Sequence, residues 1–352
     1  MPTHLASLDS LVHPHQMEVQ EFSSYALVID ARSAEAYQED RLPGAVNVPV
    51  AADRLASTQF ASMGGGIAAM DGEAEPSMPY PLAAQVERLS PGDAVLVYCD
   101  RGGLDSLVWA GPLRVAGFRV DVLGGGWINY RRWVSAGLEL LPRALTFRPL
   151  LAPPAGGLCR VVDRLVQQGE QVIDLTALAG QRLVPGLTLQ GDTPPSQAAF
   201  ETALLDALRK LDPQRPVWMR MGLAGLGGLT MPPALRDALY RSISTRLEVP
   251  VSARAIAWSD RLQAMGTGIN TLLQAISASG MSPAATVIEQ WRSLTNAGKV
   301  TDALTEIIAT YIDPRAEVSG WTGQLRVVRL ASLTTEAVAT EVDDWRRHGR
   351  LV

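Results

Sequence analysis

One cysteine of the chain stands where an apolar strand is expected to end and a helix to follow. Cys99 comes directly after the apolar run 94–98 and opens the loop 99–106, which reads CDRGGLDS. Backbone N–H groups of such a loop, and the N-terminus of the helix predicted from Leu107, create a positive potential that favours thiolate over thiol. A thiolate there can attack sulfur or selenium and carry the atom. We predict a reactive Cys99; the alternative is a buried structural cysteine.

The rest of the loop suggests how a donor would be held. Arg101 is placed to orient an anionic donor, and the two glycines let the backbone curl around the sulfur. Ser106 is expected to donate one further hydrogen bond, and the N–H groups of residues 100–106 to stabilise an anionic terminal atom as an oxyanion hole does. The predicted donor-binding loop consists of Asp100, Arg101, Gly102, Gly103, Leu104, Asp105 and Ser106.

Asp105 has two interpretations. Its position before the predicted helix suits an N-cap. Its charge near Cys99 opposes the thiolate and repels anionic donors such as selenophosphate or thiosulfate. Because Arg101 remains to bind an anion, we expect donor binding to be weakened or changed and not abolished.

Composition predicts a globular chain large enough for two domains. The 352 residues are 47% hydrophobic and 19% charged. No apolar run reaches the roughly eighteen residues that span a bilayer, and residues 1–20 do not resemble a leader, so we expect a cytoplasmic protein without a membrane partner. Two cysteines and four distant histidines predict neither a disulfide scaffold nor a metal site. With a net charge of −5, any nucleic acid must be bound by a local arginine patch.

Hydrophobic patterning predicts an α/β chain with a boundary in the proline-rich stretch 141–154. We place one domain at 1–140 and a second at 145–352. Apolar runs predict strands, and periodic apolar positions predict helices. The expected strands are 25–30, 45–49, 94–98, 118–123, 147–151, 171–174 and 324–330, with another beginning at Val217; the expected helices include 34–38, 159–168, 197–210, 232–245, 261–278, 282–296, 300–311 and 335–348.

The N-terminal part of the chain resembles a rhodanese domain. The segments Asp30-Ala31-Arg32 and 41–49 match two signatures that precede the catalytic strand in that family, and 124–127 (GGGW) matches the glycine turn after it. The loop Cys-x-Arg-Gly-Gly narrows the resemblance to the bacterial tRNA 2-selenouridine synthases. Weaker matches at 174–179, 195–201 and 311–314 extend it along most of the chain. The resemblance implies that Asp30 and Arg32 support the loop.

The resemblance also implies a fold and an activity. Members of that family join a rhodanese domain to a P-loop domain and replace sulfur by selenium in the wobble 2-thiouridine of certain tRNAs. We therefore expect a rhodanese-like domain followed by a P-loop-NTPase-like α/β domain with a helical C-terminal part. The implied activity is a sulfur or selenium transfer through a persulfide, or its selenium analogue, on Cys99. Selenophosphate or a sulfur donor would be the co-substrate and tRNA a possible partner.

The second half departs from the family at its phosphate loop. Residues 152–159 read APPAGGLC, so Leu158 occupies the position of the family's lysine and Cys159 that of its hydroxyl residue. A P-loop needs the ammonium to neutralise phosphate and the hydroxyl to hold the metal, and the two prolines remove N–H donors. The segment Gly156, Gly157, Leu158 and Cys159 is therefore predicted to be a degenerate P-loop. We expect no bound cofactor, and neither ATP nor magnesium.

Two other functions remain open at this point. One is a catalytically degenerate paralogue that serves a true enzyme as a binding or scaffold partner. The other is a rhodanese-type sulfurtransferase with an acceptor other than tRNA, in which apolar residues around Leu158, Met219 and Met221 would shape a new pocket.

Overall fold

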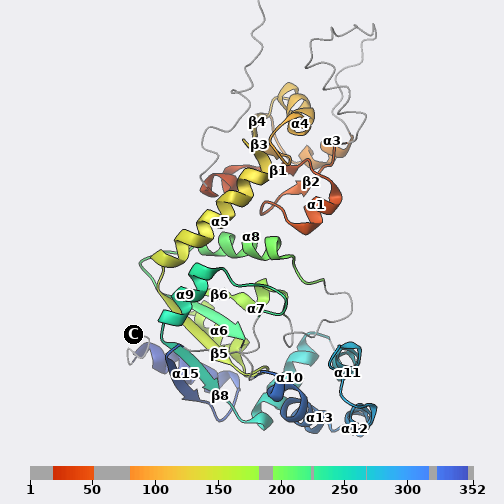
Figure 1. Ribbon diagram of the computed structural model, residues 1–352, viewed down its shortest axis with the longest axis vertical. Helices are drawn as coiled ribbons and strands as arrows, with labels where there is room; N and C mark the ends of the chain where they lie inside the picture. The colour runs from red at the N-terminus through yellow and green to blue at the C-terminus, as the bar shows by residue number, and fades with distance from the viewer. Residues whose placement is uncertain are drawn as a thin grey trace, which may run out of the picture. The chain divides into compact units, whose positions relative to one another are not determined.

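The computed structural model describes residues 19–50, 80–181, 193–222, 226–266, 268–316 and 323–347. They form two compact units: one takes the chain up to Gly137 together with Glu201–Arg209, and the other takes Leu138–Phe200 and the chain from Lys210 onward. Both units are α/β with parallel sheets, which confirms the predicted fold class (Figure 1). None of the described helices is both long and apolar enough to cross a bilayer.

The first unit is built on a parallel sheet with the strand order β2-β1-β3-β4. Because parallel strands end at one edge, the register sets Asp30 at the end of β1 beside Tyr98 at the end of β3. Cys99 therefore leaves the sheet at the edge where Asp30 and Arg32 lie. The strands are β1 (Leu27–Asp30), β2 (Val46–Asn47), β3 (Ala94–Tyr98) and β4 (Arg119–Val122).

Helices bury the apolar side chains of this sheet. Val95, Val97 and Trp109 belong to one buried cluster, in which the indole N–H of Trp109 donates to the carbonyl of Val48 at 2.7 Å. The helical segments are η2 (Val19–Ser24), α1 (Ala34–Glu39), α3 (Tyr80–Val86), α4 (Leu104–Val115) and α5 (Gly126–Ala144), and the C-terminal part of α8 (Gln197–Leu208) belongs to the same unit.

The second unit is built on a five-stranded parallel sheet with the order β6-β7-β5-β8-β9. Its central strand runs through a glycine-containing loop into α6, which is the strand–loop–helix arrangement of P-loop proteins. The strands are β5 (Phe147–Ala152), β6 (Gln171–Asp174), β7 (Val217–Gly222), β8 (Ser244–Glu248) and β9 (Leu325–Arg329); the flanking helices are α6 (Leu158–Gln167), α7 (Leu175–Leu178), α9 (Pro233–Arg241) and α15 (Thr335–Arg347).

A helical subregion follows β8 and has its own apolar core, which includes Trp258, Leu272, Trp291 and Ile307. Arg254 is 3% exposed there and forms an ion pair with Asp313. The segments are α10 (Val251–Ala264), α11 (Ile269–Ala278), α12 (Ala285–Asn296), α13 (Val300–Ile307), the π-helical turn η3 (Ile308–Ile312) and α14 (Asp313–Ala316).

Two sequence predictions of helices are wrong. The helix expected over 232–245 ends at Arg241, and Ser244–Glu248 forms β8 instead. This strand has few apolar residues, so the local hydrophobic pattern does not predict it. Pairing with β5 and β9 in the sheet stabilises it instead. The single helix expected over 261–278 is two helices, because the glycines at 266 and 268 separate α10 from α11.

Candidate functional site

The sulfur of Cys99 faces the loop that follows β3. The N–H of Gly103 donates to Sγ at 3.3 Å. The start of α5 fixes the beginning of the loop: the N–H of Trp127 donates to the carbonyl of Cys99 at 2.8 Å, and that of Ile128 to the carbonyl of Asp100 at 3.1 Å. The loop thus directs one N–H group at the sulfur, and backbone hydrogen bonds from α5 hold its first two residues.

Cys99 is more buried than a position at the mouth of a loop suggests. The residue is 2% exposed and belongs to the buried cluster of the first unit, whereas Asp100, Arg101 and Gly103 are exposed. The packed sheet lies on one side of the sulfur and the exposed loop on the other. A donor would therefore reach the sulfur from the loop side, by displacing loop residues and not the core.

The predicted N-cap role of Asp105 is wrong. The helix α4 begins at Leu104 and not at Leu107, its N-cap is Gly103, and Asp105 lies in the first turn. Burial raises the pKa of the Asp105 carboxyl, and the negative charge of Asp100 raises this pKa further. The two carboxyl groups are therefore close enough to interact electrostatically beside the loop.

The N–H groups of the loop do not all converge on the sulfur as expected. The N–H of Ser106 donates to the carbonyl of Gly103 at 3.1 Å instead. The side chain of Ser106 is buried, and its Oγ has no hydrogen-bond partner among the described residues. Ser106 thus keeps an unused hydroxyl donor in the first turn of α4, next to the loop.

Two glycines let the loop pass very close to the turn before α5. A Cβ at Gly126 would lie 2.3 Å from the carbonyl oxygen of Cys99 and 2.4 Å from the nitrogen of Gly102. A Cβ at Gly102 would lie 2.4 Å from the carbonyl oxygen of Leu123, and φ at Gly102 is +69°. Both positions therefore need glycine. The sequence marked 124–127 as a family motif but did not reveal this contact.

A buried ion pair lies directly behind the loop. Asp30 and Arg32 have side chains 0% and 3% exposed, and Arg32 Nη2 lies 2.7 Å from Asp30 Oδ2. Arg32 Nε donates to the same carboxylate. The hydroxyl of Tyr98 donates to Asp30 Oδ2 at 2.6 Å, and burial raises the pKa of this hydroxyl far above its usual range. The residue before Cys99 is thus anchored to the pair.

Aromatic and polar groups extend this network. The Arg32 guanidinium lies 3.9 Å from the ring centre of Trp127, and Arg32 Nη2 donates to the carbonyl of Asp40 at 2.6 Å. The carboxylate of Asp40 accepts from Thr202 Oγ1 at 2.8 Å and from Arg131 Nη1 at 3.1 Å. Burial raises the pKa of Asp40, against the opposing effects of these two donors. The sequence analysis identified Asp30 and Arg32 but missed their partners.

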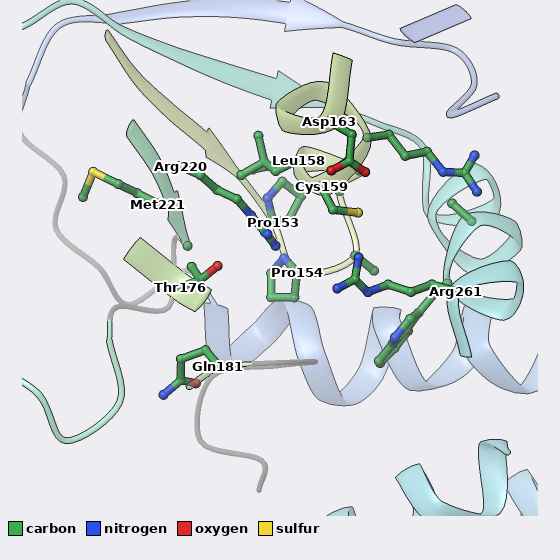
Figure 2. A pocket seen from close by; sticks show the side chains of 18 of the residues that line it. Pro153, Pro154, Leu158, Cys159, Asp163, Thr176, Gln181, Arg220, Met221 and Arg261 are labelled. Carbon is green, nitrogen blue, oxygen red and sulfur yellow. The ribbon is translucent and has the colours of Figure 1, made fainter. Parts of the chain in front are cut away.

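The predicted degenerate P-loop lies at a cavity in the second unit. The cavity has a volume of about 320 Å³, and Gly156, Gly157, Leu158 and Cys159 all line it (Figure 2). Leu158, predicted to occupy the lysine position, is 6% exposed within an apolar cluster and brings no charge to the loop. Met221 also lines the cavity, whereas Met219 is fully buried in the core.

The two cysteines are free and lie in different units. Among the described residues, no group of three His, Cys, Asp or Glu side chains is arranged to hold a metal ion.

Comparison with known proteins finds relatives of the part of the chain that contains the Cys99 loop. Residues 16–132 match the rhodanese-like domain family, and this range contains the Cys99 loop together with Asp30 and Arg32. A tRNA 2-selenouridine synthase of Chromohalobacter salexigens is 33% identical over 192 residues, which are 51% of this chain and 50% of that protein. The chain is thus similar to this tRNA 2-selenouridine synthase over about half its length, and its residues 16–132 resemble a rhodanese-like domain.

Further comparisons define the extent of the likeness. A tRNA 2-selenouridine synthase of Nitrosomonas europaea is 25% identical over 196 residues, which are 53% of this chain and 49% of that protein. The chain spans about half the length of these two curated relatives. The crystal structure of the BH2092 protein from Bacillus halodurans is 22% identical and covers 33% of this chain and 67% of that chain. Its TM-score is 0.20, at which the likeness carries no argument about the fold.

The buried ion pair yields a stability prediction. Arg32→Met leaves the Asp30 carboxylate buried without its cation, so we expect a loss of about 3–5 kcal/mol in the free energy of unfolding. Arg41→Met, at an exposed arginine that lies over the ring of Tyr37, should change this free energy by about 1 kcal/mol or less. Urea denaturation of both variants measures the difference. Equal effects would show that the pair does not hold this edge of the sheet.

The glycine contact yields a second prediction. Gly102→Ala should cost more than about 2 kcal/mol, because the new Cβ is strained at positive φ and meets the carbonyl of Leu123. Gly111→Ala in α4 is the matched control: its Cβ meets nothing within 4 Å beyond its chain neighbours and its own helix. The gain in helix propensity is offset by the following Pro112, so we expect a change of about 1 kcal/mol or less. Thermal unfolding should therefore show a clear loss of stability for Gly102→Ala and a small change for Gly111→Ala, and a Gly102→Ala variant as stable as the wild type contradicts the contact.

Proposed function

We propose that this chain is a sulfur or selenium transferase of the rhodanese type, with Cys99 as the nucleophile. The observation that carries the proposal is the position of Cys99. It leaves a parallel strand at its carboxyl end, its Sγ accepts the Gly103 N–H at 3.3 Å, and it lies within the rhodanese match. The transfer needs a sulfur or selenium donor as co-substrate and no bound cofactor, ATP or magnesium.

The first step is a displacement at the outer sulfur of the donor. With thiosulfate, the Cys99 thiolate attacks the sulfane sulfur, the S–S bond of thiosulfate breaks, and sulfite leaves with the bonding electron pair. The product is a Cys99 persulfide whose terminal sulfur carries the negative charge, so charge and atoms balance. The N–H of Gly103 already points at Cys99 Sγ and can donate to that anion. We propose the hydroxyl of Ser106, which has no partner among the described residues, as a second donor. With selenophosphate, the same thiolate attacks the selenium, the P–Se bond breaks, and phosphite leaves with the bonding electron pair, which gives a selenenyl sulfide on Cys99.

We propose tRNA as the acceptor of the transferred atom. The support is the name of the two relatives, tRNA 2-selenouridine synthase, each matched over about half its length. The overall negative charge of the chain requires RNA to be held by local arginines and not by the whole surface.

Mass spectrometry of the intact and digested chain tests the proposal, with the two cysteines as matched variants. After incubation with thiosulfate or selenophosphate, we expect one added sulfur or selenium atom on Cys99, in the wild type and in Cys159→Ser but not in Cys99→Ser. When thiolated tRNA and a thiol reductant are added to the selenium-loaded chain, the thiol supplies the two electrons that break the S–Se bond, selenium replaces the sulfur of the nucleoside, and sulfide leaves. We expect the mass of the tRNA nucleoside to rise accordingly, and no such rise with Cys99→Ser.

Three outcomes decide between the alternatives. An unmodified Cys99 with every donor contradicts the transferase and leaves a binding or scaffold partner. A selenium-loaded Cys99 that leaves the tRNA nucleoside unchanged contradicts the tRNA acceptor and leaves a sulfurtransferase with another acceptor. Loading at Cys159 would contradict the assignment of the nucleophile.

The charge of Asp105 predicts a pH-dependent donor effect. Asp105→Asn should raise the rate of transfer from thiosulfate about fivefold near neutral pH, by removing roughly 1 kcal/mol of repulsion. The pKa of Asp105 is raised by burial and by Asp100, so as the pH falls the wild type loses this charge earlier than an ordinary aspartate would. The ratio of variant to wild-type rates should therefore fall toward one as the solution is acidified.

Glu87→Gln is the matched control for this prediction, because Glu87 is exposed and precedes β3, at the end of the strand opposite Cys99. It should leave the rate unchanged at every pH. A rate ratio for Asp105→Asn that equals one throughout the range would show that this carboxylate does not act on the donor.

A further inference from the structure

The cavity at the loop between β5 and α6 gathers hydrogen-bond donors that lack acceptors. Arg261 reaches it from α10, and its side chain has no hydrogen-bond or ion-pair partner among the described residues. Arg220 reaches it from β7; its Nη1 pairs with Asp174 at 2.5 Å, but its buried Nε has no partner in the described part of the chain. Figure 2 shows both guanidinium groups pointing toward the loop at Pro153 and Pro154.

The first turn of α6 adds backbone donors to the same space. Gly157 is the N-cap of this ten-residue helix, and no side chain caps it. The first N–H groups of a helix have no partner within the helix, and Gly157, Leu158 and Cys159 line the cavity. Unmet donors from α6, β7 and α10 therefore face one cavity, which favours a ligand that carries acceptor oxygens.

The charges around the cavity limit how negative the ligand is. Three arginines and two aspartates line it. Arg160 pairs with Asp260, and Arg220 pairs with Asp174. Within the part of the chain that the structure describes, Arg261 is therefore the arginine of this set without an ion-pair partner, and the exposed Asp163 carries the opposite charge. Pro153 and Pro154 also withhold two N–H groups from the loop. Such a site compensates about one negative charge and not the several charges of a diphosphate.

Most of the remaining lining is apolar, with Thr176 and Gln181 as polar side chains. Leu158, Met221, Ala257 and Trp258 line the cavity beside the two guanidinium groups. A volume of about 320 Å³ is within the range of small-molecule sites, which are typically apolar with a few polar groups that fix orientation.

We infer that this cavity binds a small monoanion with an apolar body, of the carboxylate class, without a metal ion. The carboxylate lies at the N-terminus of α6, between Arg261 and Arg220, and the apolar body lies along Met221, Ala257 and Trp258. This site is independent of the transfer proposed at Cys99.

Isothermal titration calorimetry of the full-length chain tests the inference with octanoate, octanol, inorganic pyrophosphate and Mg·ATP as probes. Octanoate should bind at one site per chain and more tightly than the other three. Arg261→Met should weaken octanoate binding about tenfold or more and leave the binding of octanol unchanged. Arg292→Met is the matched control: this exposed arginine on α12 pairs with Glu289 and does not line the cavity, so octanoate should bind the variant as it binds the wild type.

The alkylation of Cys159 locates the ligand. Cys159 lines the cavity and is half-buried. In the native chain, the rate of its alkylation should therefore fall in proportion to the fraction of sites that octanoate occupies. The alkylation rate of Cys99 should stay unchanged. Three outcomes would overturn the inference: pyrophosphate or Mg·ATP binding more tightly than octanoate, equal octanoate binding by the wild type and Arg261→Met, or octanoate binding that leaves Cys159 unprotected. None of these outcomes bears on the loading of Cys99.

Discussion

The buried pair of Asp30 and Arg32 is the constraint on which the first unit depends. Removing two charges from water is costly, and the cost is offset only when both partners and their remaining hydrogen bonds are in place. Here the carboxylate also holds the hydroxyl of Tyr98, and the guanidinium also holds Trp127 and the carbonyl of Asp40. Tyr98 precedes Cys99, and the N–H of Trp127 donates to the Cys99 carbonyl. The ion pair therefore fixes the backbone on both sides of the thiol.

The two units use one structural plan with different chemistry. In each, a parallel strand ends at the edge of a sheet and a glycine-containing loop leads into a helix N-terminus, an arrangement that favours negative charge. In the first unit the loop begins with a nucleophile. In the second, the loop enters α6 through Gly157, Leu158 and Cys159 and carries no charged side chain, and arginines from β7 and α10 bring positive charge from outside the loop.

Local pattern was sufficient where apolar runs were long and bounded by turns, as in β1, β3 and β5, and it placed Cys99 directly after β3. Asp30 and Arg32 were singled out by the resemblance to rhodanese domains and not by local pattern. Local pattern failed where tertiary context decides. β8 is a polar strand specified by its neighbours. The N-terminus of α4 depends on the fold of the glycine loop, so the helix starts three residues earlier than predicted. The contact of Thr202 with Asp40 joins residues 162 positions apart, and the cavity beside Cys159 depends on Arg261 from a distant helix; neither leaves a signal in a single sequence.

The central claim is that Cys99 is a buried but reactive thiol. A local movement of its loop exposes the sulfur, and the core does not unfold. Alkylation by iodoacetamide at increasing, sub-denaturing urea concentrations, read at each cysteine by mass spectrometry, tests it most directly. If the loop opens locally, the labelling rate of Cys99 stays nearly constant below the unfolding transition. If instead the rate rises with urea in proportion to the global unfolding constant, the thiol is sealed in the core, and Cys99 is not the nucleophile of a transferase.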